Sequence, residues 1–378
     1  MGVKVHFYRL SWIQWVCLHR LASAFLLLFV LSGSTLFDPL LALGGSGQVP
    51  HASSGIAWDN PLMGWDAFHY LHLAREGYTP NHRSNAFYPL WPLLIRLGSF
   101  FTFGDLAASG WLLANLFSVL GAMAFYHLVA RLRGEKVAFW AVAVWLAFPG
   151  AVFLTFIYTE PLFFLLSMVF FDGIYRKRPW QIVVAGLFLP MTRAVGIFCL
   201  APLGWMLLRG RLPRCQWPLI LAPLCGYAAY FGIMYAYTGN PFAGFEAQQH
   251  YPNKPSIANI FDIPAIWNAF LNVGQFHGLT DSALDRVLFL IFIACLPFIW
   301  RLDQSLFFYS VGVGLIPAMS NWFFSYTRFI MMCFPVFIIL GIGISRLERG
   351  WLRWGVLAIF GILQFVLLWR YANFRWAG

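Results

Sequence analysis

Apolar runs of the length of a helix recur along the whole chain and are separated by short segments that carry Lys and Arg. A helix needs about 20 apolar residues to cross the hydrocarbon core of a bilayer. The pattern predicts about eleven spans, over residues 20–43, 106–130, 137–156, 160–175, 180–191, 194–208, 216–237, 284–300, 304–322, 327–345 and 351–369. We therefore expect an all-α polytopic membrane protein whose residues 1–378 form one integral-membrane domain.

The composition agrees with a membrane protein and excludes a soluble or disordered one. Of the 378 residues, 60% are hydrophobic and only 10% are charged, whereas an ordinary soluble domain has about 25% charged residues. The net charge of +11 would point to nucleic acid in a soluble protein. In a membrane protein it follows from the accumulation of Lys and Arg in cytoplasmic loops, so no nucleic-acid partner is expected.

The basic residues predict the orientation in the membrane. With a cytoplasmic N-terminus, sixteen of the 25 Lys and Arg residues fall on the inner side, while ten of the 14 acidic residues are outer or embedded. The sixteen are Lys4, Arg9, Arg20, Arg131, Arg133, Lys136, Arg176, Lys177, Arg178, Arg209, Arg211, Arg214, Arg301, Arg346, Arg349 and Arg353. The alternative that the first segment is a signal peptide is disfavoured, because its apolar run is long enough to span.

Two longer segments are expected on the outer side, over about 44–105 and about 238–285. Within the first, residues 87–103 are apolar but short, and they contain Pro89 and Pro92. A span at this place would move every later basic loop to the outside. We therefore expect a re-entrant or surface-lying helix there.

The first outer segment also carries the best candidate for chemistry. Nothing interrupts a helix between Gly64 and Glu76, and Asp66, His69, Tyr70 and Leu73 share one of its faces. A carboxylate beside an imidazole can take a proton from a hydroxyl group. The alternative is a plain amphipathic surface helix whose polar residues face water.

These residues resemble a known family. The sequence WDAFHYLHLAREGY, followed by NAFYPLWPLL, is similar to the first-loop signature of the GPI mannosyltransferase II (PIG-V) family. Weaker similarities follow in the same order, in AFPGAVFLTFIYTEPLFFLLS, MTRAVGIFCLAP, YTGNPFAGFEAQQHY and SYTRFIMMCFPVFIILG. The chain departs from the family pattern at Tyr88, Trp91 and His250–Tyr251. These departures bear on the donor sugar and the acceptor more than on the chemistry.

The resemblance implies a GT-C architecture, in which a multi-span enzyme takes a sugar from a polyprenyl-phosphate carrier on the outer or luminal face. Such enzymes use an acidic residue of the first outer loop, which is Asp66 in this chain. As general base, Asp66 would deprotonate the acceptor hydroxyl, and direct displacement would invert the anomeric centre. The phosphate leaves as a stable anion, so no metal cofactor is required, although a metal on Asp66 and Asp59 stays an alternative.

Several further residues are candidates for binding substrate. A departing phosphate needs a cation near the outer face, and arginine pairs well with phosphate oxygens. The candidates are Arg193, Arg328 and Lys254 for the phosphate, with His69, Gln248 and His250 as further substrate contacts. The alternative is that the two arginines pair with Glu160 or Asp105, or extend to lipid head groups. Asp59, Asp38, Glu160 and Tyr158 are weaker candidates for a second acidic or a structural role.

Two other functions stay open at this point. A transporter or flippase would place ionisable residues at the membrane midplane and often has two similar halves. Neither feature is evident here. An enzyme of the same architecture that transfers arabinose or glucose is not excluded by the sequence. The expected partners are the polyprenyl-phosphate sugar, a lipid-linked or glycan acceptor, and membrane lipids, in a bacterial plasma membrane or the endoplasmic reticulum.

Overall fold

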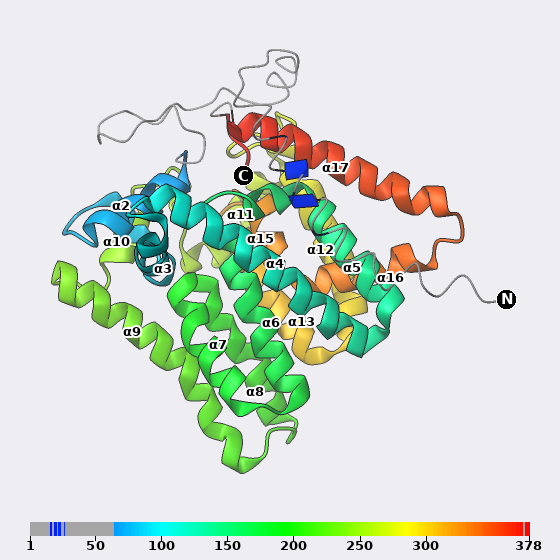
Figure 1. Cartoon of the computed structure of the whole chain (residues 1–378), viewed down its shortest axis with the longest axis horizontal. Helices are drawn as coiled ribbons and strands as arrows, with labels where there is room; N and C mark the ends of the chain where they lie inside the picture. Colours follow the sequence, from blue (N-terminus) through cyan, green and yellow to red (C-terminus); the bar gives the residue numbers. More distant parts are fainter. Residues whose placement is uncertain (1–15, 17–18, 21, 24–25, 27–63, 373–374) are drawn as a thin grey trace.

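The computed structural model describes residues 16, 19–20, 22–23, 26, 64–372 and 375–378. Most of the predicted span 20–43 lies outside these residues, as do Asp38 and Asp59. The described part is helical, apart from one isolated bridge between Gln275 and Ser282. Figure 1 shows the bundle, with α7, α8 and α9 projecting away from the end that carries α2 and α3.

The elements follow one another along the chain with short connections. They are α2 (Asp66–Glu76), η4 (Arg83–Ala86), α3 (Leu90–Gly98), η5 (Ser99–Thr102), α4 (Leu106–Arg133), α5 (Glu135–Ala147), η6 (Pro149–Leu154), α6 (Glu160–Arg176), α7 (Pro179–Thr192), η7 (Ala194–Cys199), α8 (Leu200–Leu208), η8 (Arg214–Ile220), α9 (Leu221–Thr238), α10 (Ala243–Gln248), η9 (Ile257–Phe261), α11 (Ile263–Leu271), α12 (Ala283–Leu302), α13 (Gln304–Ser310), the π-helical η10 (Val311–Leu315), α14 (Ile316–Ser320), α15 (Tyr326–Met332), α16 (Phe334–Arg346) and α17 (Gly350–Ala372).

Four stretches of the described chain are long and apolar enough to cross a membrane. They are Leu106–Arg133, Arg214–Thr238, Ala283–Leu302 and Gly350–Tyr371, and a fifth is added if α15 and α16, bent by 81°, count as one span. The protein is thus an all-helical integral membrane protein. The expected number of eleven spans is not confirmed.

Several of the predicted spans are not single uninterrupted α-helices. Residues 137–156 divide at Phe148 into α5 and η6, residues 304–322 divide into α13, η10 and α14, and residues 327–345 bend at Cys333. A proline follows each of the first and third breaks, at Pro149 and Pro335. Proline lacks an amide donor and disfavours helical geometry in the residue before it, which hydrophobicity alone does not register.

The stretch 87–103 forms a short helix instead of a span. Helix α3 buries Leu90, Trp91 and Ile95 against the bundle, while Phe100, Phe101 and Phe103 after it are more than 80% exposed. At 13 residues, the apolar stretch Leu90–Thr102 is too short to cross a bilayer. The helix is therefore short, as expected, and is not among the stretches long enough to span.

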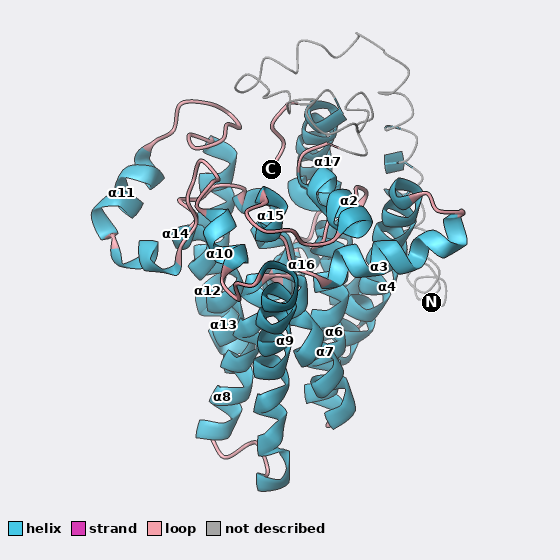
Figure 2. Ribbon diagram, turned by 90° about the vertical axis from the view of Figure 1, so that its left-hand side faces the viewer, coloured by secondary structure: helices cyan, strands magenta, loops and turns pink. Residues whose placement is uncertain are grey.

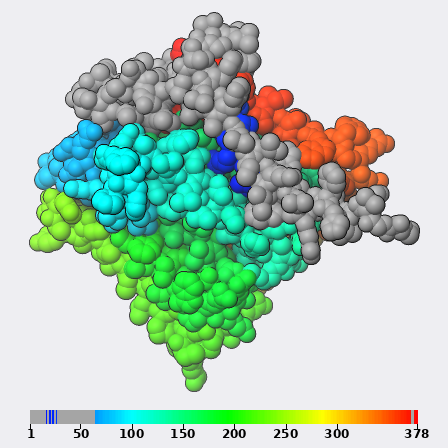
Figure 3. Space-filling view, viewed as in Figure 1, coloured from blue at the N-terminus to red at the C-terminus, as the bar shows by residue number. Residues whose placement is uncertain are grey.

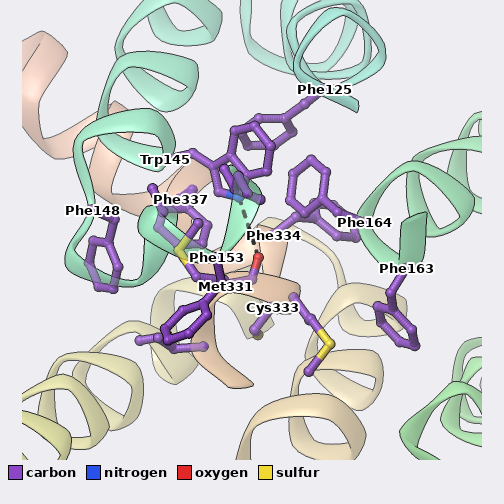
Figure 4. Packing of buried hydrophobic residues seen from close by; sticks show 14 of the residues in the cluster. Phe125, Trp145, Phe148, Phe153, Phe163, Phe164, Met331, Cys333, Phe334 and Phe337 are labelled. Atoms are coloured by element: carbon purple, nitrogen blue, oxygen red, sulfur yellow. Dashed lines mark hydrogen bonds between the residues drawn. The ribbon is translucent and has the colours of Figure 1, made fainter. Parts of the chain in front are cut away.

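The core is an aromatic cluster that joins helices far apart in the sequence. Trp145 of α5 stacks on Phe164 of α6 at 4.1 Å between ring centres, and Phe125 of α4 packs edge-on against both rings. The Trp145 indole donates a hydrogen bond of 3.4 Å to the carbonyl oxygen of Met331 (Figure 4). This contact fixes the end of α15 against the middle of the bundle.

The predicted outer segments gather at one end of the bundle. Figure 2 shows α2, α10 and α11 in the upper half, with the connection from α8 to η8 at the lower tip. That tip is the green point at the bottom of Figure 3, and it exposes Arg209, Arg211 and Arg214. These basic residues therefore lie at the opposite end from Asp66.

One basic residue is not where the charge pattern predicted it. Arg20 was expected at the inner face, but its guanidinium lies within the bundle and donates 3.1 Å hydrogen bonds to Leu154 O and Thr155 Oγ1. Both acceptors immediately precede the segment that leads to Glu160. The prediction was wrong because carbonyl and hydroxyl oxygens inside the bundle can satisfy an arginine in place of water.

Candidate active site

Asp66 begins α2, as the uninterrupted stretch from Gly64 to Glu76 predicted. The residue before it, Trp65, has a positive φ of 56°, which turns the chain sharply into the helix. The Tyr371 hydroxyl donates a 3.1 Å hydrogen bond to the carbonyl oxygen of Gly64. The turn is therefore held from the C-terminal helix, and the Asp66 side chain keeps 27% of its surface exposed.

Arg328 of α15 joins Asp66 to a second carboxylate. Its Nη1 donates to Asp66 Oδ2 at 2.6 Å, and its Nε donates to Glu160 Oε1 at 2.7 Å. The guanidinium also lies over the rings of Tyr158 and Phe153, at 4.5 and 5.2 Å from their centres. With 8% of its side chain exposed, Arg328 is held from several sides.

Glu160 is shared by two arginines. Its Oε1 also accepts from Arg193 Nη1 at 2.9 Å, and the same Nη1 donates to Thr159 Oγ1 at 2.8 Å. Glu160 is the first residue of α6, where the helix dipole favours a negative charge. The four side chains, Asp66, Arg328, Glu160 and Arg193, thus form an alternating chain of two carboxylates and two guanidinium groups with no net charge.

A cavity of about 690 Å³ lies beside this chain of charges. Asp66 and Arg193 line it, whereas Arg328 and Glu160 lie behind them and are more deeply buried. Its remaining lining is mostly apolar or aromatic, with Thr192, Gln248, Gln249, Ser256, Ser320 and Asn321 as polar exceptions. A concave apolar site with a few converging polar groups is the usual form of a ligand site.

His69 is engaged by its neighbours instead of facing the cavity. Its Nδ1 lies 2.9 Å from Ser84 Oγ, its Nε2 lies 3.4 Å from Tyr251 OH, and its ring stacks on Phe87 at 4.7 Å. Burial lowers the pKa of His69 to about 4, against a smaller opposing effect of the Asp66 carboxylate. A neutral His69 therefore holds together the two segments that were predicted to be outer, and Tyr251 is a contact that sequence reasoning missed.

The structure brings some of the other candidates to the cavity and not others. Gln248 lines it, and so does Tyr88, one of the departures from the family pattern. Tyr158 lies against Arg328. His250 lines a separate polar cavity of about 80 Å³, and Lys254 is exposed and lines neither cavity.

No group of three or more His, Cys, Asp or Glu side chains suited to a metal ion occurs among the described residues. The alternative of a metal on Asp66 and Asp59 involves a residue outside them.

A family model described as Mannosyltransferase (PIG-V) matches residues 10–211, which is more than half of the 378-residue chain. The chain belongs to the PIG-V mannosyltransferase family. Within the family match lie Asp66, Glu160 and Arg193, whereas Arg328 and Gln248 follow it.

Curated relatives in the PIG-V family are similar over part of their length. The GPI alpha-1,6-mannosyltransferase 2 of Rattus norvegicus is 31% identical over 175 residues, which are 44% of this chain and 35% of that protein. The GPI mannosyltransferase 2 of Cryptococcus neoformans is 28% identical over 260 residues, or 60% of this chain and 59% of that protein. The chain thus spans between about a third and three fifths of these relatives.

Solved structures resemble the PIG-V family member described here at low sequence identity. ArnT from Cupriavidus metallidurans bound to undecaprenyl phosphate has a TM-score of 0.49 at 16% identity, covering 92% of this chain and 62% of that one. The archaeal oligosaccharyltransferase AglB from Archaeoglobus fulgidus, in complex with an inhibitory peptide and a dolichol-phosphate, has a TM-score of 0.48 at 13% identity, covering 93% and 56%.

Proposed function

We propose that the protein is a membrane mannosyltransferase that moves mannose from a polyprenyl-phosphate carrier to a hydroxyl of a lipid-linked or glycan acceptor. The observation that carries the proposal is that a carboxylate and a guanidinium, Asp66 and Arg193, line one largely apolar cavity in a PIG-V family member. The basic tip with Arg209, Arg211 and Arg214 lies at the opposite end. This supports a reaction at the outer or luminal face, with the basic tip on the cytoplasmic side.

Asp66 is suited to act as the general base. Arg328 donates a hydrogen bond to Oδ2 of Asp66, and no described residue donates to Oδ1 of Asp66. In the proposed step, Oδ1 takes the proton of the acceptor hydroxyl while that oxygen bonds to the anomeric carbon. The bond from this carbon to the phosphate oxygen breaks, and polyprenyl phosphate leaves with the electron pair. Displacement from the opposite side inverts the anomeric centre.

Arg193 is better placed than Arg328 to meet the phosphate. Arg193 lines the cavity, and its contacts with Glu160 and Thr159 both use Nη1. The hydrogens on its Nε and Nη2 therefore have no acceptor among the described residues and are available to phosphate oxygens. Arg328 is already committed to Asp66 and Glu160, so we assign it to orienting the base. This reaction requires no divalent metal.

The test is a transfer assay with Asp66→Asn in lipid nanodiscs. Purified protein receives radiolabelled polyprenyl-phosphate mannose and crude membrane acceptors, with and without EDTA, and polyprenyl-phosphate glucose or arabinose in parallel. General-base catalysis contributes about 10²–10⁴-fold, so Asp66→Asn is expected to lose at least about 100-fold in turnover while still binding undecaprenyl phosphate. EDTA is expected to change nothing.

The matched control is Asp105→Asn. Asp105 is an exposed outer carboxylate that caps α4 through the amides of Ala107 and Ala108, and asparagine caps helices equally well. Its turnover should equal that of the parent protein. Full activity in Asp66→Asn would exclude Asp66 as the base, and transfer of another sugar in preference to mannose would overturn the assignment of the donor.

A further inference from the structure

The helix that carries Arg328 begins in an unusual way. Three of the four residues before α15 have left-handed backbone angles, with φ of 54° at Trp322, 61° at Phe323 and 57° at Ser325. Residues other than glycine adopt this region at a cost in free energy. The intrinsic backbone preferences of these residues therefore do not stabilise the segment that precedes Arg328. Contacts with other parts of the molecule must stabilise it.

The residue at the cap position of α15 does not supply the cap. Ser325 makes no side-chain hydrogen bond to the first turn of the helix, although serine in this position normally does so. The first amide groups of a helix have no acceptor within the helix itself. An acceptor from elsewhere in the chain is needed at this buried helix start.

Asp285 supplies that acceptor from the first turn of α12. Its Oδ1 accepts from the backbone N of Thr327 at 2.7 Å and from Thr327 Oγ1 at 2.5 Å. The side chain is fully buried, so water does not replace this contact. A carboxylate at the start of a helix is favoured by the helix dipole as well as by the hydrogen bonds.

Asp285 is itself held in place by a hydrogen bond of its backbone. The amide N of Asp285 donates to Ser282 Oγ at 3.1 Å, and Ser282 Oγ lies 2.9 Å from His277 Nδ1. The next residue, Arg286, places its guanidinium over the Phe323 ring at 5.4 Å. The first turn of α12 therefore contacts the strained segment at Phe323 and the first turn of α15 at Thr327.

We propose that Asp285 is a positioning residue that caps α15 from α12 and thereby sets Arg328 against Asp66 and Glu160. Thr327 directly precedes Arg328, and Arg328 bridges both carboxylates at 2.6 and 2.7 Å. Without the cap, the start of α15 is free to relax out of its left-handed entry, and Arg328 no longer holds Asp66 at a fixed angle. The consequence for turnover rests on the function proposed above.

The experiment uses the full chain in lipid nanodiscs with Asp285→Ala, Asp285→Asn, Thr327→Val and Thr327→Ser. Thr327→Ser keeps both donors, Thr327→Val keeps only the amide, and Asp285→Asn keeps one neutral acceptor. Hydrogen exchange is measured in peptides covering 322–332. Mannose transfer is measured per bound undecaprenyl phosphate, together with the KM for the donor. Normalising to bound lipid phosphate removes the effect of any unfolded fraction.

We expect exchange in this segment to rise at least about tenfold in Asp285→Ala, with smaller increases in Asp285→Asn and Thr327→Val and none in Thr327→Ser. Turnover per bound lipid should fall in the same order, with the KM for the donor changed less than twofold. The control is Asp303→Asn, because Asp303 caps α13 through Ser305 N at 2.7 Å and accepts a hydrogen bond from Tyr175, and among the described residues it makes no hydrogen bond or ion pair with α15. It should alter neither quantity.

Unchanged exchange in Asp285→Ala would overturn the cap, whether or not any transfer is detected. Faster exchange with unchanged turnover per bound lipid would overturn the positioning role, and so would an equal loss in Asp303→Asn. If Asp285→Ala does not fold, Asp285→Asn and Thr327→Val decide the question. A parent protein that transfers no sugar would refute the proposed function while the exchange result still stands.

Discussion

The substitution Glu160→Gln tests two effects of the buried charges, on the stability of the fold and on the binding of a lipid phosphate. It removes one carboxylate and keeps the size of the side chain. Glu160 has 1% of its side chain exposed, and its Oε1 accepts from Arg328 and Arg193 at 2.7 and 2.9 Å. Its Oε2 is buried with no hydrogen-bond partner among the described residues. The substitution leaves both guanidinium groups facing a neutral amide and turns the balanced set of four charges into one of +1.

Two effects of opposite sign follow from this change. Removing one partner of a buried ion pair costs about 3–5 kcal/mol of stability, so the variant should unfold at a clearly lower temperature. The uncompensated positive charge should attract a lipid phosphate more strongly. At a separation of roughly 6 Å and an effective dielectric constant of about 20, one unit of charge contributes about 3 kcal/mol. Allowing for screening, we expect roughly tenfold tighter binding.

The assay pairs a thermal unfolding scan with a titration of undecaprenyl phosphate, both in nanodiscs. Glu135→Gln is the matched control, because Glu135 also begins a helix, α5, but is exposed. It reproduces the loss of a favourable charge at a helix start without disturbing an ion pair. The reasoning is refuted if Glu160→Gln unfolds at the temperature of the parent protein, or if it binds the lipid phosphate no more tightly.

Two further predictions concern residues around the cavity. The pKa of His69 falls from its ordinary 6.5 to about 4 on folding. Between these pH values the unfolded chain binds a proton that the folded chain does not. The free energy of unfolding therefore decreases by up to about 3 kcal/mol as the pH falls. Unfolding temperatures measured from pH 7 to 4 should therefore fall less steeply in His69→Gln, and parallel curves would contradict the assignment. Gln248→Ala should raise the KM of one substrate by about tenfold, as loss of a buried hydrogen bond to a ligand predicts, whereas Lys254→Ala should change neither KM by more than about twofold; equal effects in steady-state kinetics would refute the distinction.

Local patterns predicted the parts of the site that depend on neighbours in the chain. The helix over residues 64–76 was predicted because no residue in it breaks a helix and its polar positions recur at helical spacing, and α2 covers Asp66–Glu76. The short outer helix was predicted from Pro89, Pro92 and the placement of basic loops. The helix-breaking residues act on their neighbours in the chain, and the order of basic loops is read along the chain, so a sequence displays both directly.

The breaks inside the spans were missed for a related reason. Hydrophobicity averaged over the whole run 304–322 does not show where α13, η10 and α14 begin and end. The position of Arg20 was missed because its acceptors, Leu154 O and Thr155 Oγ1, lie more than 130 residues away.

The sequence alone determined that this is a helical membrane protein of low charge content. It also identified Asp66, among few acidic residues, as the best candidate for the catalytic base. Only the tertiary structure decided the partners of that residue. Arg328 is 262 residues from Asp66 and 168 from Glu160, and Asp285 is 42 residues from Thr327. Whether an arginine binds a phosphate or a neighbouring carboxylate depends on which helices pack together. Burial then makes that choice energetically decisive, because a charge out of water requires a partner at contact distance.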